Sequence, residues 1–408
     1  MAKNHTICGL DIGTSSIKAI IASRDQENQV LEVIGKVSLP VFGIRRGVVF
    51  RTEDVSKSIT QALERLSSEA NCKIDDVYAS AGGSHIFSVS SHGTVIVSRA
   101  DQKISEEDVN RVIEAAKVFP LPSNREILET FPLEFIVDGQ GHIKEPQNMQ
   151  GQRLEVSVLA LCAFSPFMKN LSNAIYSAWP HVADITPSAL ASSRAVLTPQ
   201  QKELGVCLVD IGSGTTDVAV YEEGDLIHAA VFPVGSERIT NDLAICLKTD
   251  VELAEQIKKE FGSCIFSGGR RKEKIELSKD EGNGEQLSFS HKMLVKIIEA
   301  RVCEIFDQVQ KELKKAPLKG SLPAGIVLTG GGTKLPKMVE LVKRELKLPV
   351  RLGKVHGMLG IDDDNLWSTA AGLALAAFDL DEGRSRSMPQ LPQGFVRKMK
   401  GILQNFIP

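Results

Sequence analysis

The chain has 408 residues, 42% of them hydrophobic and 24% charged, which are ordinary values that exclude a disordered or a fibrous protein. A single compact core rarely extends beyond about 250 to 300 residues, so this length predicts two or more domains. A formal charge of -3 argues against nucleic-acid binding, which needs a concentrated basic face. Seven cysteines without a CxxC spacing indicate reduced thiols in a reducing compartment.

Near the amino terminus, an apolar run from Thr6 to Gly13 is followed by a second β-rich run from Ile17 to Ala22. This pattern predicts a β-hairpin whose turn contains Asp-Ile-Gly. Nearly the same phrase returns later, where the apolar run from Gly205 to Gly212 precedes a run from Val218 to Tyr221. The repeated phrase predicts two halves of similar topology.

The residues between the two repeated phrases have a different sequence pattern. Ser84 to Ser98 predicts two short strands, and 104–119 predicts a helix with Ser105 as its N-cap and Asp108 three residues later. The segments 127–139 and 153–164 alternate or run apolar, as strands do. Together they predict a small α+β insertion within the first half.

The second half contains two segments with helical periodicity, Val251 to Gly262 and His291 to Lys315, separated by a polar stretch of short strands or loops at 267–290. Ala324 to Leu346 predicts a buried strand, a glycine turn and an amphipathic helix. Leu366 to Phe378 predicts a helix of small residues, suited to close packing.

The end of the chain predicts an amphipathic helix, 394–408, after a polar, proline-bearing linker at 381–393. Its apolar side chains share one face, and three basic residues lie on the other. The helix is too short to span a bilayer but suits the interface of an anionic membrane; the alternative is docking on its own protein. The expected membrane contacts are Phe395, Val396, Arg397, Lys398, Met399, Lys400, Ile402, Leu403, Phe406 and Ile407.

The two hairpin turns predict a phosphate site, because glycine lets backbone N–H groups approach closely. Hydroxyls add donors, a lysine adds a point charge, and carboxylates at strand ends suit hydrated Mg²⁺. Alone, each turn is also an ordinary strand connection. The predicted phosphate residues are Asp11, Gly13, Thr14, Ser15, Ser16, Lys18, Asp210, Gly212, Ser213, Gly214, Thr215 and Thr216, with Asp11 and Asp210 holding Mg²⁺ through water.

A third glycine cluster follows the strand predicted after Ala324 and lets a nucleoside lie flat against the backbone. Two phosphate hairpins followed by such a turn resemble the ATPase superfold of actin and the heat-shock chaperones. The resemblance implies an α/β fold of two related halves that hold the β- and γ-phosphates of ATP, with a connecting helix at Asp184–Leu197. It places adenosine near Gly235, Glu255, Lys258, Gly330, Gly331, Gly332 and Lys334.

The inserted segment and its flanks resemble the bacterial cell-division FtsA family. The phrases GIRRGVVFRTEDVSKSITQALERL, VYASAGGSHIFSVSSHGTVIVS and ILETFPLEFIVDGQGHIKEPQNMQGQRLEVSVLALCA carry the resemblance, which extends from Ile7 to Phe378. Arg51 and Asn148 depart from the pattern, where a small polar or acidic residue and a glycine are expected. The resemblance implies subdomain 1A at 1–83, 165–200 and 366–380, an SHS2-like subdomain 1C at 84–164, subdomain 2A at 201–236 and 312–365, and subdomain 2B at 237–311.

The same resemblance implies an ATP-binding protein that polymerises into actin-like protofilaments and tethers FtsZ filaments to the cytoplasmic face of the inner membrane at the division site. The implied partners are the FtsZ C-terminal peptide at 2B, further copies of the chain, the anionic membrane surface and other divisome proteins, with no nucleic acid. Hydrolysis is expected to be slow, because Thr186 and Ser188 offer no carboxylate or amide to position water. The alternatives are a pilus-assembly adaptor similar to PilM and a small-molecule kinase of the same superfold.

Overall fold

The computed structural model describes residues 6–24, 30–74, 76–98, 101–179, 181–266, 274–278, 286–361 and 365–385. Two sheets organise these residues, one in each half of the chain. The first contains β1 (Thr6–Ile12), β2 (Ser16–Arg24), β3 (Leu31–Pro40), β6 (Val77–Ala81), β11 (Val182–Pro187) and β19 (Met358–Leu359). The second begins with β12 (Val206–Ile211), β13 (Thr216–Glu222), β14 (Asp225–Phe232), β17 (Ile326–Thr329) and β18 (Val350–Leu352).

The two sheets repeat one five-strand pattern. The order in the first half is β11-β6-β1-β2-β3, and the order in the second half is β18-β17-β12-β13-β14. In each half the central strand, β1 or β12, pairs in parallel with one neighbour and forms an antiparallel hairpin with the other. The predictions of a duplicated hairpin and of two similar halves are therefore confirmed.

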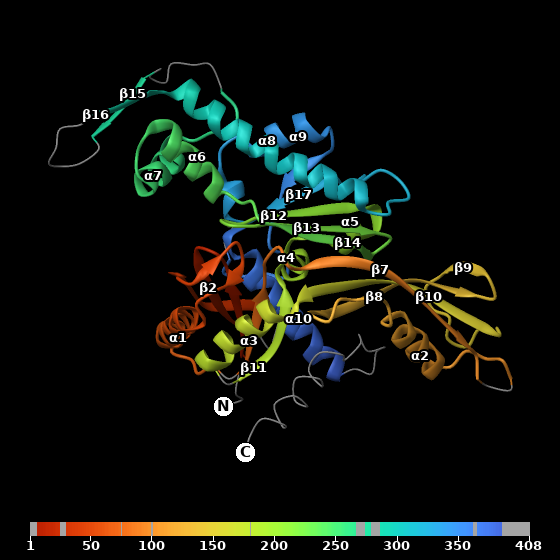
Figure 1. The fold of residues 1–408 in the computed structure, drawn as a ribbon. Coiled ribbons are helices and arrows are strands. Elements are labelled where there is room, and N and C mark those ends of the chain that lie inside the picture. Colours follow the sequence, from red (N-terminus) through yellow and green to blue (C-terminus); the bar gives the residue numbers. More distant parts are fainter. Residues whose placement is uncertain are drawn as a thin grey trace.

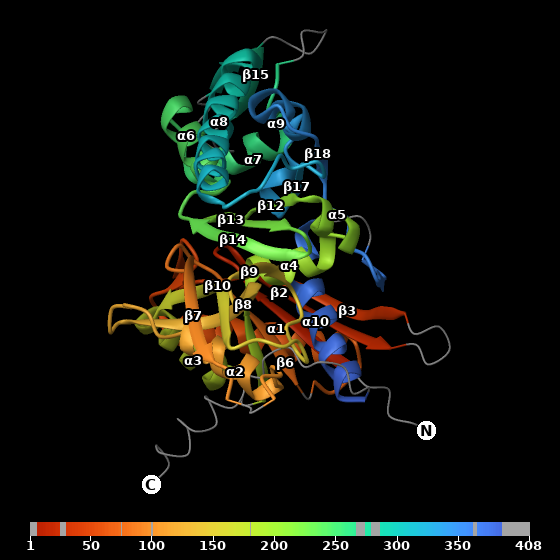
Figure 2. The same ribbon diagram turned by 90° about the vertical axis from the view of Figure 1, so that its right-hand side faces the viewer.

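Helices pack on both sheets. One hydrophobic core lies mainly in the first half but also includes residues of β12, β13, β14 and β17, and a second core lies in the second half. In Figures 1 and 2 the helices α6 to α9 lie in the upper part of the molecule, and α1, α3 and α10 lie in the lower part, beside the strands of the first sheet. The lower helices are α1 (Thr52–Glu69), α3 (Ser165–Ala178), α4 (Ser188–Val196) and α10 (Ser368–Ser385), the last preceded by a 3-10 turn, η2 (Asn365–Trp367). The upper elements are α5 (Pro199–Leu204), α6 (Glu237–Leu247), α7 (Val251–Phe261), α8 (His291–Lys315), η1 (Gly331–Lys334) and α9 (Met338–Leu346).

Most helices match their predicted segments, and α8 matches in both bounds. The helix predicted at 366–378 is longer, because α10 continues to Ser385 and so occupies the start of the predicted linker. The predicted connecting helix begins later than expected, since Val182 to Pro187 extends the first sheet as β11 before α4 starts. The polar stretch before α8 contains a small hairpin of β15 (Lys274–Ser278) and β16 (Gln286–Ser290). None of the helices in the described ranges is long and apolar enough to cross a membrane.

The insertion has its own core and consists of α2 (Glu106–Ala116) packed on β7 (Phe87–Ile96), β8 (Arg125–Val137), β9 (Gln140–Ile143) and β10 (Arg153–Phe164). Ser105 and Asp108 form the expected capping box. The two short strands predicted at Ser84–Ser98 are wrong, because β7 is one continuous strand. Gly93 allows α2 to pack closely, since a Cβ there would lie 2.3 Å from the Val112 carbonyl oxygen.

The insertion also joins the sheet of the second half. Its strands extend that sheet in the order β14-β7-β10-β8-β9, and a single residue pair, Phe87 with Ala230, links β7 to β14. The Ser88 hydroxyl accepts a hydrogen bond from the Ala229 N–H at 3.1 Å beside this pair. A segment inserted in the first half of the sequence therefore contacts both halves of the molecule.

One departure from the family pattern has a structural explanation. Asn148 has φ of 68°, a left-handed conformation that glycine adopts freely and that asparagine tolerates better than most residues. The loop geometry for which a glycine was expected is therefore kept with asparagine.

Candidate functional site

A cavity lies between the two halves, where the turns of both hairpins meet the glycine turn after β17 and the first residues of α4 and α10. It brings together residues that are far apart in the sequence. Both predicted phosphate turns and the glycine turn contribute to its lining, whereas Gly235, Glu255 and Lys258 do not. The predicted residues that line it are Asp11, Gly13, Thr14, Ser15, Lys18, Asp210, Gly212, Ser213, Thr215, Gly330 and Gly331.

Other predicted residues lie outside this lining. Thr216 is buried, and its hydroxyl donates to the Val234 carbonyl at 2.7 Å. Lys258 is also buried, and its Nζ lies 2.6 Å from Glu255 Oε2 and donates to the Thr240 hydroxyl at 2.8 Å. The remaining predicted residues that do not line the cavity are Ser16, Gly214, Gly235, Gly332 and Lys334.

The lining also contains residues that the sequence analysis did not select: Ile12, Gly47, Gly82, Ser188, Asp217, Asn365, Leu366 and Thr369. The sequence did contain a signal that could have identified Asp217. In the first hairpin Asp11 pairs across the strands with Lys18, and in the second Asp210 pairs with Asp217. Aligning the two repeats residue by residue identifies Asp217 as the counterpart of Lys18. Gly47 and Gly82 carry no comparable signal, because only the packing of the chain brings them here.

The first hairpin presents an ion pair to the cavity. The Gly13 N–H donates to the Ser16 carbonyl at 3.1 Å, which closes the turn. Asp11 is 8% exposed, and its Oδ2 lies 3.1 Å from Lys18 Nζ while its Oδ1 accepts from the Ser80 hydroxyl at 3.1 Å. Both oxygens of this carboxylate therefore have partners within the first half.

The second hairpin has the same turn with a different charge pattern. The Gly212 N–H donates to the Thr215 carbonyl at 2.9 Å, as in the first turn. Burial and the carboxylate of Asp11 raise the pKa of Asp210 to about 6, although Lys18 acts in the opposite direction. Asp217 is 6% exposed, and its Oδ1 has no hydrogen-bond partner. Burial, then Asp210 and Asp11, raise the pKa of Asp217 well above its usual range.

Two glycines allow the close approach of these turns. Gly330 has φ of 86°, and a Cβ there would lie 2.2 Å from Asp210 Oδ1. Gly214 faces the other half, since its Cβ would lie 2.7 Å from the Thr14 side chain. The two hairpins thus touch through Gly214 and Thr14 at the edge of the cavity.

The residues that line the cavity include groups that favour an anion and groups that favour a cation. Glycine turns and hydroxyls favour phosphate oxygens, and the clustered carboxylates of Asp11, Asp210 and Asp217 favour a cation. Within the described part of the chain, no group of three or more His, Cys, Asp or Glu side chains is arranged to hold a metal ion directly.

Sequence comparisons relate the chain to bacterial cell-division proteins. A family model described as cell division protein FtsA matches residues 207–372, and one for the SHS2 domain inserted in FtsA matches 83–162. The cell division protein FtsA of Pseudomonas aeruginosa is 36% identical over 372 residues, covering 90% of this chain and 88% of that protein. The FtsA of Neisseria meningitidis is 37% identical over 400 residues, with 96% and 94% covered.

Structural comparisons agree on the fold. The PilM-PilN type IV pilus biogenesis complex has a chain that superposes with a TM-score of 0.64 at 16% identity, covering 92% of this chain and 99% of that one. MreB5 of Spiroplasma citri bound to ADP superposes with a TM-score of 0.58 at 14% identity, with 94% and 99% covered. The predicted α/β, actin-like fold with an inserted SHS2 subdomain is confirmed. The predicted helix at 394–408 lies outside the described residues.

Proposed function

This chain belongs to the FtsA family of cell division proteins, and from that premise we propose that it binds Mg-ATP in the cavity between its two halves. The observation that carries the proposal is the convergence of two matched hairpin turns and a glycine turn on one cavity. The β- and γ-phosphates lie between the hairpins, where backbone N–H groups, Lys18 and the hydroxyls of Thr14, Ser213 and Thr215 surround them.

The carboxylates of the cavity fit a hydrated Mg²⁺ ion. Asp217 is buried with one oxygen unpartnered, and Asp210 has a raised pKa, so negative charge gathers here without enough positive charge to balance it. Asp11, Asp210 and Asp217 would hold Mg²⁺ through its bound waters, and the ion would balance their charge and that of the phosphate oxygens. Asp217 is thereby added to the two ligands that the sequence predicted.

The adenosine end of the site is proposed at Gly235, Glu255, Lys258 and the glycines after β17. The backbone supports this position, since a Cβ on Gly235 would lie 2.3 Å from the Ser213 carbonyl oxygen. The segment that leads into α6 therefore packs directly on the second phosphate turn. The Glu255–Lys258 ion pair fixes both side chains beside α6, where they border the ribose and the base.

A calorimetric titration of the full chain with ATP, with and without Mg²⁺, tests the site. We expect saturable binding that strengthens when Mg²⁺ is added. The protein is first shown to be folded by circular dichroism. If this folded protein gives no detectable heat with ATP and shows no competition between ADP and ATP, the proposal is contradicted.

Hydrolysis is proposed to be slow. Ser188 lines the cavity at the start of α4, and its hydroxyl donates to the Ala81 carbonyl at 3.1 Å. At the start of the connecting helix, neither Ser188 nor Thr186 supplies a carboxylate or an amide to orient water, and the loss of a general base at such a position costs about 10²- to 10⁴-fold in rate. Phosphate release under saturating Mg-ATP should remain far below about 10 s⁻¹, the median for enzymes; turnover near that value would contradict this part.

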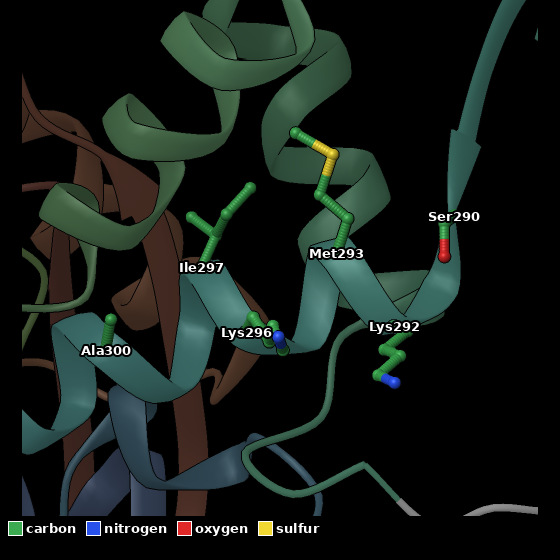
Figure 3. A pocket seen from close by; sticks show the side chains of 6 residues that line it. All are labelled: Ser290, Lys292, Met293, Lys296, Ile297 and Ala300. Carbon is green, nitrogen blue, oxygen red and sulfur yellow. The ribbon is translucent and has the colours of Figure 1, made fainter.

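We propose that subdomain 2B binds the C-terminal peptide of FtsZ on α8. A shallow pocket there is lined by Ser290, Lys292, Met293, Lys296, Ile297 and Ala300. Met293, Ile297 and Ala300 point from one side of the helix, whereas Lys292 points from the other (Figure 3). Met293 is 45% exposed. Exposed apolar side chains flanked by lysines suit a peptide with apolar and acidic residues.

Fluorescence anisotropy with a labelled FtsZ C-terminal peptide tests this contact. Met293→Lys should weaken binding about tenfold or more, because it places a charge in the apolar centre of the contact. Met149→Lys is a matched control, since Met149 has a similar exposure of 40% but lies in the insertion. Equal affinities for both variants would place the FtsZ contact elsewhere.

We further propose that the chain polymerises into protofilaments, together with other divisome proteins, on the cytoplasmic face of the cell membrane. Membrane attachment is assigned to the amphipathic segment 394–408 on its sequence pattern alone. Co-sedimentation with phosphatidylglycerol vesicles should be lost when the chain ends at Gln393 and reduced by Phe406→Glu. Undiminished sedimentation of the shortened chain would place the anchor elsewhere.

The PilM-like alternative rests on a likeness of 16% identity, which supports the fold only.

A further inference from the structure

The insertion meets the second sheet where β7 lies beside β14 (Figure 1). The backbone contact there is small, because β7 pairs with β10 over ten residue pairs but with β14 only through Phe87 and Ala230. The ion pair of Lys144 with Asp225 also joins the insertion to the second half, but both side chains are partly exposed to water, where such pairs contribute little. Better protected side-chain contacts are therefore needed to fix the insertion in place.

Three polar side chains provide such a contact: Ser88 of β7, His228 of β14 and Glu312 of α8. The Ser88 hydroxyl lies 3.3 Å from His228 Nδ1, and His228 Nε2 lies 3.0 Å from Glu312 Oε2. The side chains of His228 and Glu312 are 12% and 16% exposed, so water has little access to the bond between them. We refer to these three residues as the latch.

The partners of His228 determine its tautomer. A carboxylate only accepts hydrogen bonds, so Nε2 carries a proton and donates to Glu312. In the neutral ring Nδ1 then accepts from the Ser88 hydroxyl, whose oxygen accepts from the Ala229 N–H at 3.1 Å. The other oxygen of Glu312 accepts from Lys315 Nζ at 2.7 Å. The latch is therefore one continuous chain of hydrogen bonds from the insertion to the end of α8.

The latch spans the same two halves of the molecule as the cavity. On the first side, Gly82 lines the cavity and precedes β7, which carries Ser88. On the second side, Asp217 lines the cavity and pairs across the strands with Val231 of β14, close in the chain to His228. A movement of one half relative to the other at the cavity therefore also acts on the latch.

We propose that the latch stabilises the arrangement in which the two halves are closed on the nucleotide, and that it couples occupancy of the cavity to the orientation of the insertion. The latch is formed in the same structure in which Gly214 and Thr14 bring the two hairpin turns into contact. Because such coupling is reciprocal, a nucleotide that favours the closed arrangement also favours the latch. The inference rests on the proposed binding of Mg-ATP, although none of the three latch residues lines the cavity.

Calorimetric titration of full-length variants with Mg-ATP tests the coupling. His228→Leu removes both hydrogen bonds of the ring and should weaken Mg-ATP binding about fivefold or more, the lower end of the range for coupled sites. Ser88→Ala should also weaken it, and the double variant should lose no more than His228→Leu alone, because both changes break the same chain of bonds. By hydrogen exchange, Mg-ATP should protect the β7 and β14 amides in the wild type but not in His228→Leu.

The matched control is His92→Leu. The His92 ring also bonds to a serine, Ser157, at 3.1 Å, but both residues belong to the insertion, so Mg-ATP affinity should stay unchanged. Circular dichroism shows which variants fold, and Ser88→Ala carries the test if His228→Leu does not. Wild-type affinity in the folded latch variants, or an equal loss in His92→Leu, overturns the latch while nucleotide binding stands. Absence of Mg-ATP binding by the wild-type chain overturns both.

Discussion

The two hairpins at the cavity have the same turn geometry but carry different charges. Each turn is closed by a glycine N–H that donates to the carbonyl three residues later, Gly13 to Ser16 and Gly212 to Thr215. The position across from the strand-end aspartate is Lys18 in the first hairpin and Asp217 in the second. The first hairpin is therefore balanced by itself, whereas the second carries charge that an ion or a proton must balance.

This difference assigns different roles to the two halves. The first hairpin presents the positive charge of Lys18 to the cavity, and Lys18 and Ser80 hold Asp11 in place. The second hairpin supplies carboxylates whose pKa values are raised in the absence of a cation. A duplicated backbone with divergent charges thus suits the phosphate chain and the metal ion of the proposed Mg-ATP site.

The largest expected effect comes from removing Asp210. Asp210→Ala should weaken Mg-ATP binding by about 10- to 100-fold, the range seen when a residue that supports a metal is lost. ATP binding without Mg²⁺ should change much less, because the carboxylate acts through the ion. Calorimetric titrations with and without Mg²⁺ measure the difference. Asp307→Ala, at an exposed position on α8, is the control, and equal effects in both titrations would refute the role of the carboxylate.

A second test makes the second hairpin less acidic. In the metal-free protein, the raised pKa of Asp210 means that the folded state holds a proton that the unfolded chain has lost, so stability falls as pH rises from about 4 through about 6. Asp217→Asn removes part of the repulsion. It should therefore flatten this decline and stabilise the metal-free protein at pH 7.5 by about 1 to 3 kcal/mol, at 1.36 kcal/mol per pKa unit.

Thermal unfolding from pH 4 to pH 8 measures this effect, with EDTA and then with excess Mg²⁺. Asp250→Asn is the matched control, because asparagine also caps a helix well and Asp250 is the exposed N-cap of α7. An Asp217→Asn protein that melts at the same or a lower temperature than wild type at pH 7.5 in EDTA would show that the carboxylates do not repel each other.

A third change breaks the balance of the first hairpin. Lys18→Met removes the ion pair with Asp11 and should weaken ATP binding about tenfold, since a hydrogen bond to a charged group contributes about 1.5 to 3 kcal/mol. It should also raise the pKa of Asp210 further, because Lys18 lowers it in the wild type. The pH below which Mg-ATP binding declines should shift upward. Lys57→Met on the surface of α1 should change neither quantity.

The smallest effect is expected where the hairpins touch. Gly214→Ala places a Cβ 2.7 Å from the Thr14 side chain, and overpacking of this kind costs about 1 kcal/mol or more. Mg-ATP affinity should fall a few-fold because the halves cannot close fully. Thr14→Ala in the same chain removes the clashing atoms and should recover part of the loss. Gly320→Ala, where a Cβ meets nothing within 4 Å, is the control.

Much of the fold could be predicted from local pattern. Apolar runs predicted both hairpins, because most residues of their strands are buried. Helical periodicity predicted α8 in both bounds, because that helix is amphipathic along its length. Pattern failed at Ser84 to Ser98, where two short strands were predicted and the structure has one strand, β7. Gly93 within β7 accommodates α2, and a contact with a helix that comes later in the chain leaves no mark in the local sequence.

In the candidate site, too, some features could be predicted from the local sequence and others could not. The amino-acid sequence by itself determined the two phosphate turns, the glycine cluster and the strand-end carboxylates, because glycine and aspartate at these positions are local requirements of the turns. Only the tertiary structure decided that Gly47, Gly82 and Thr369 reach the same cavity, and that Asp217 is buried beside Asp210 with an unpartnered oxygen. The physical reason is that burial and charge proximity arise when distant segments pack together, so the pKa of a carboxylate depends on neighbours that its own stretch of sequence does not contain.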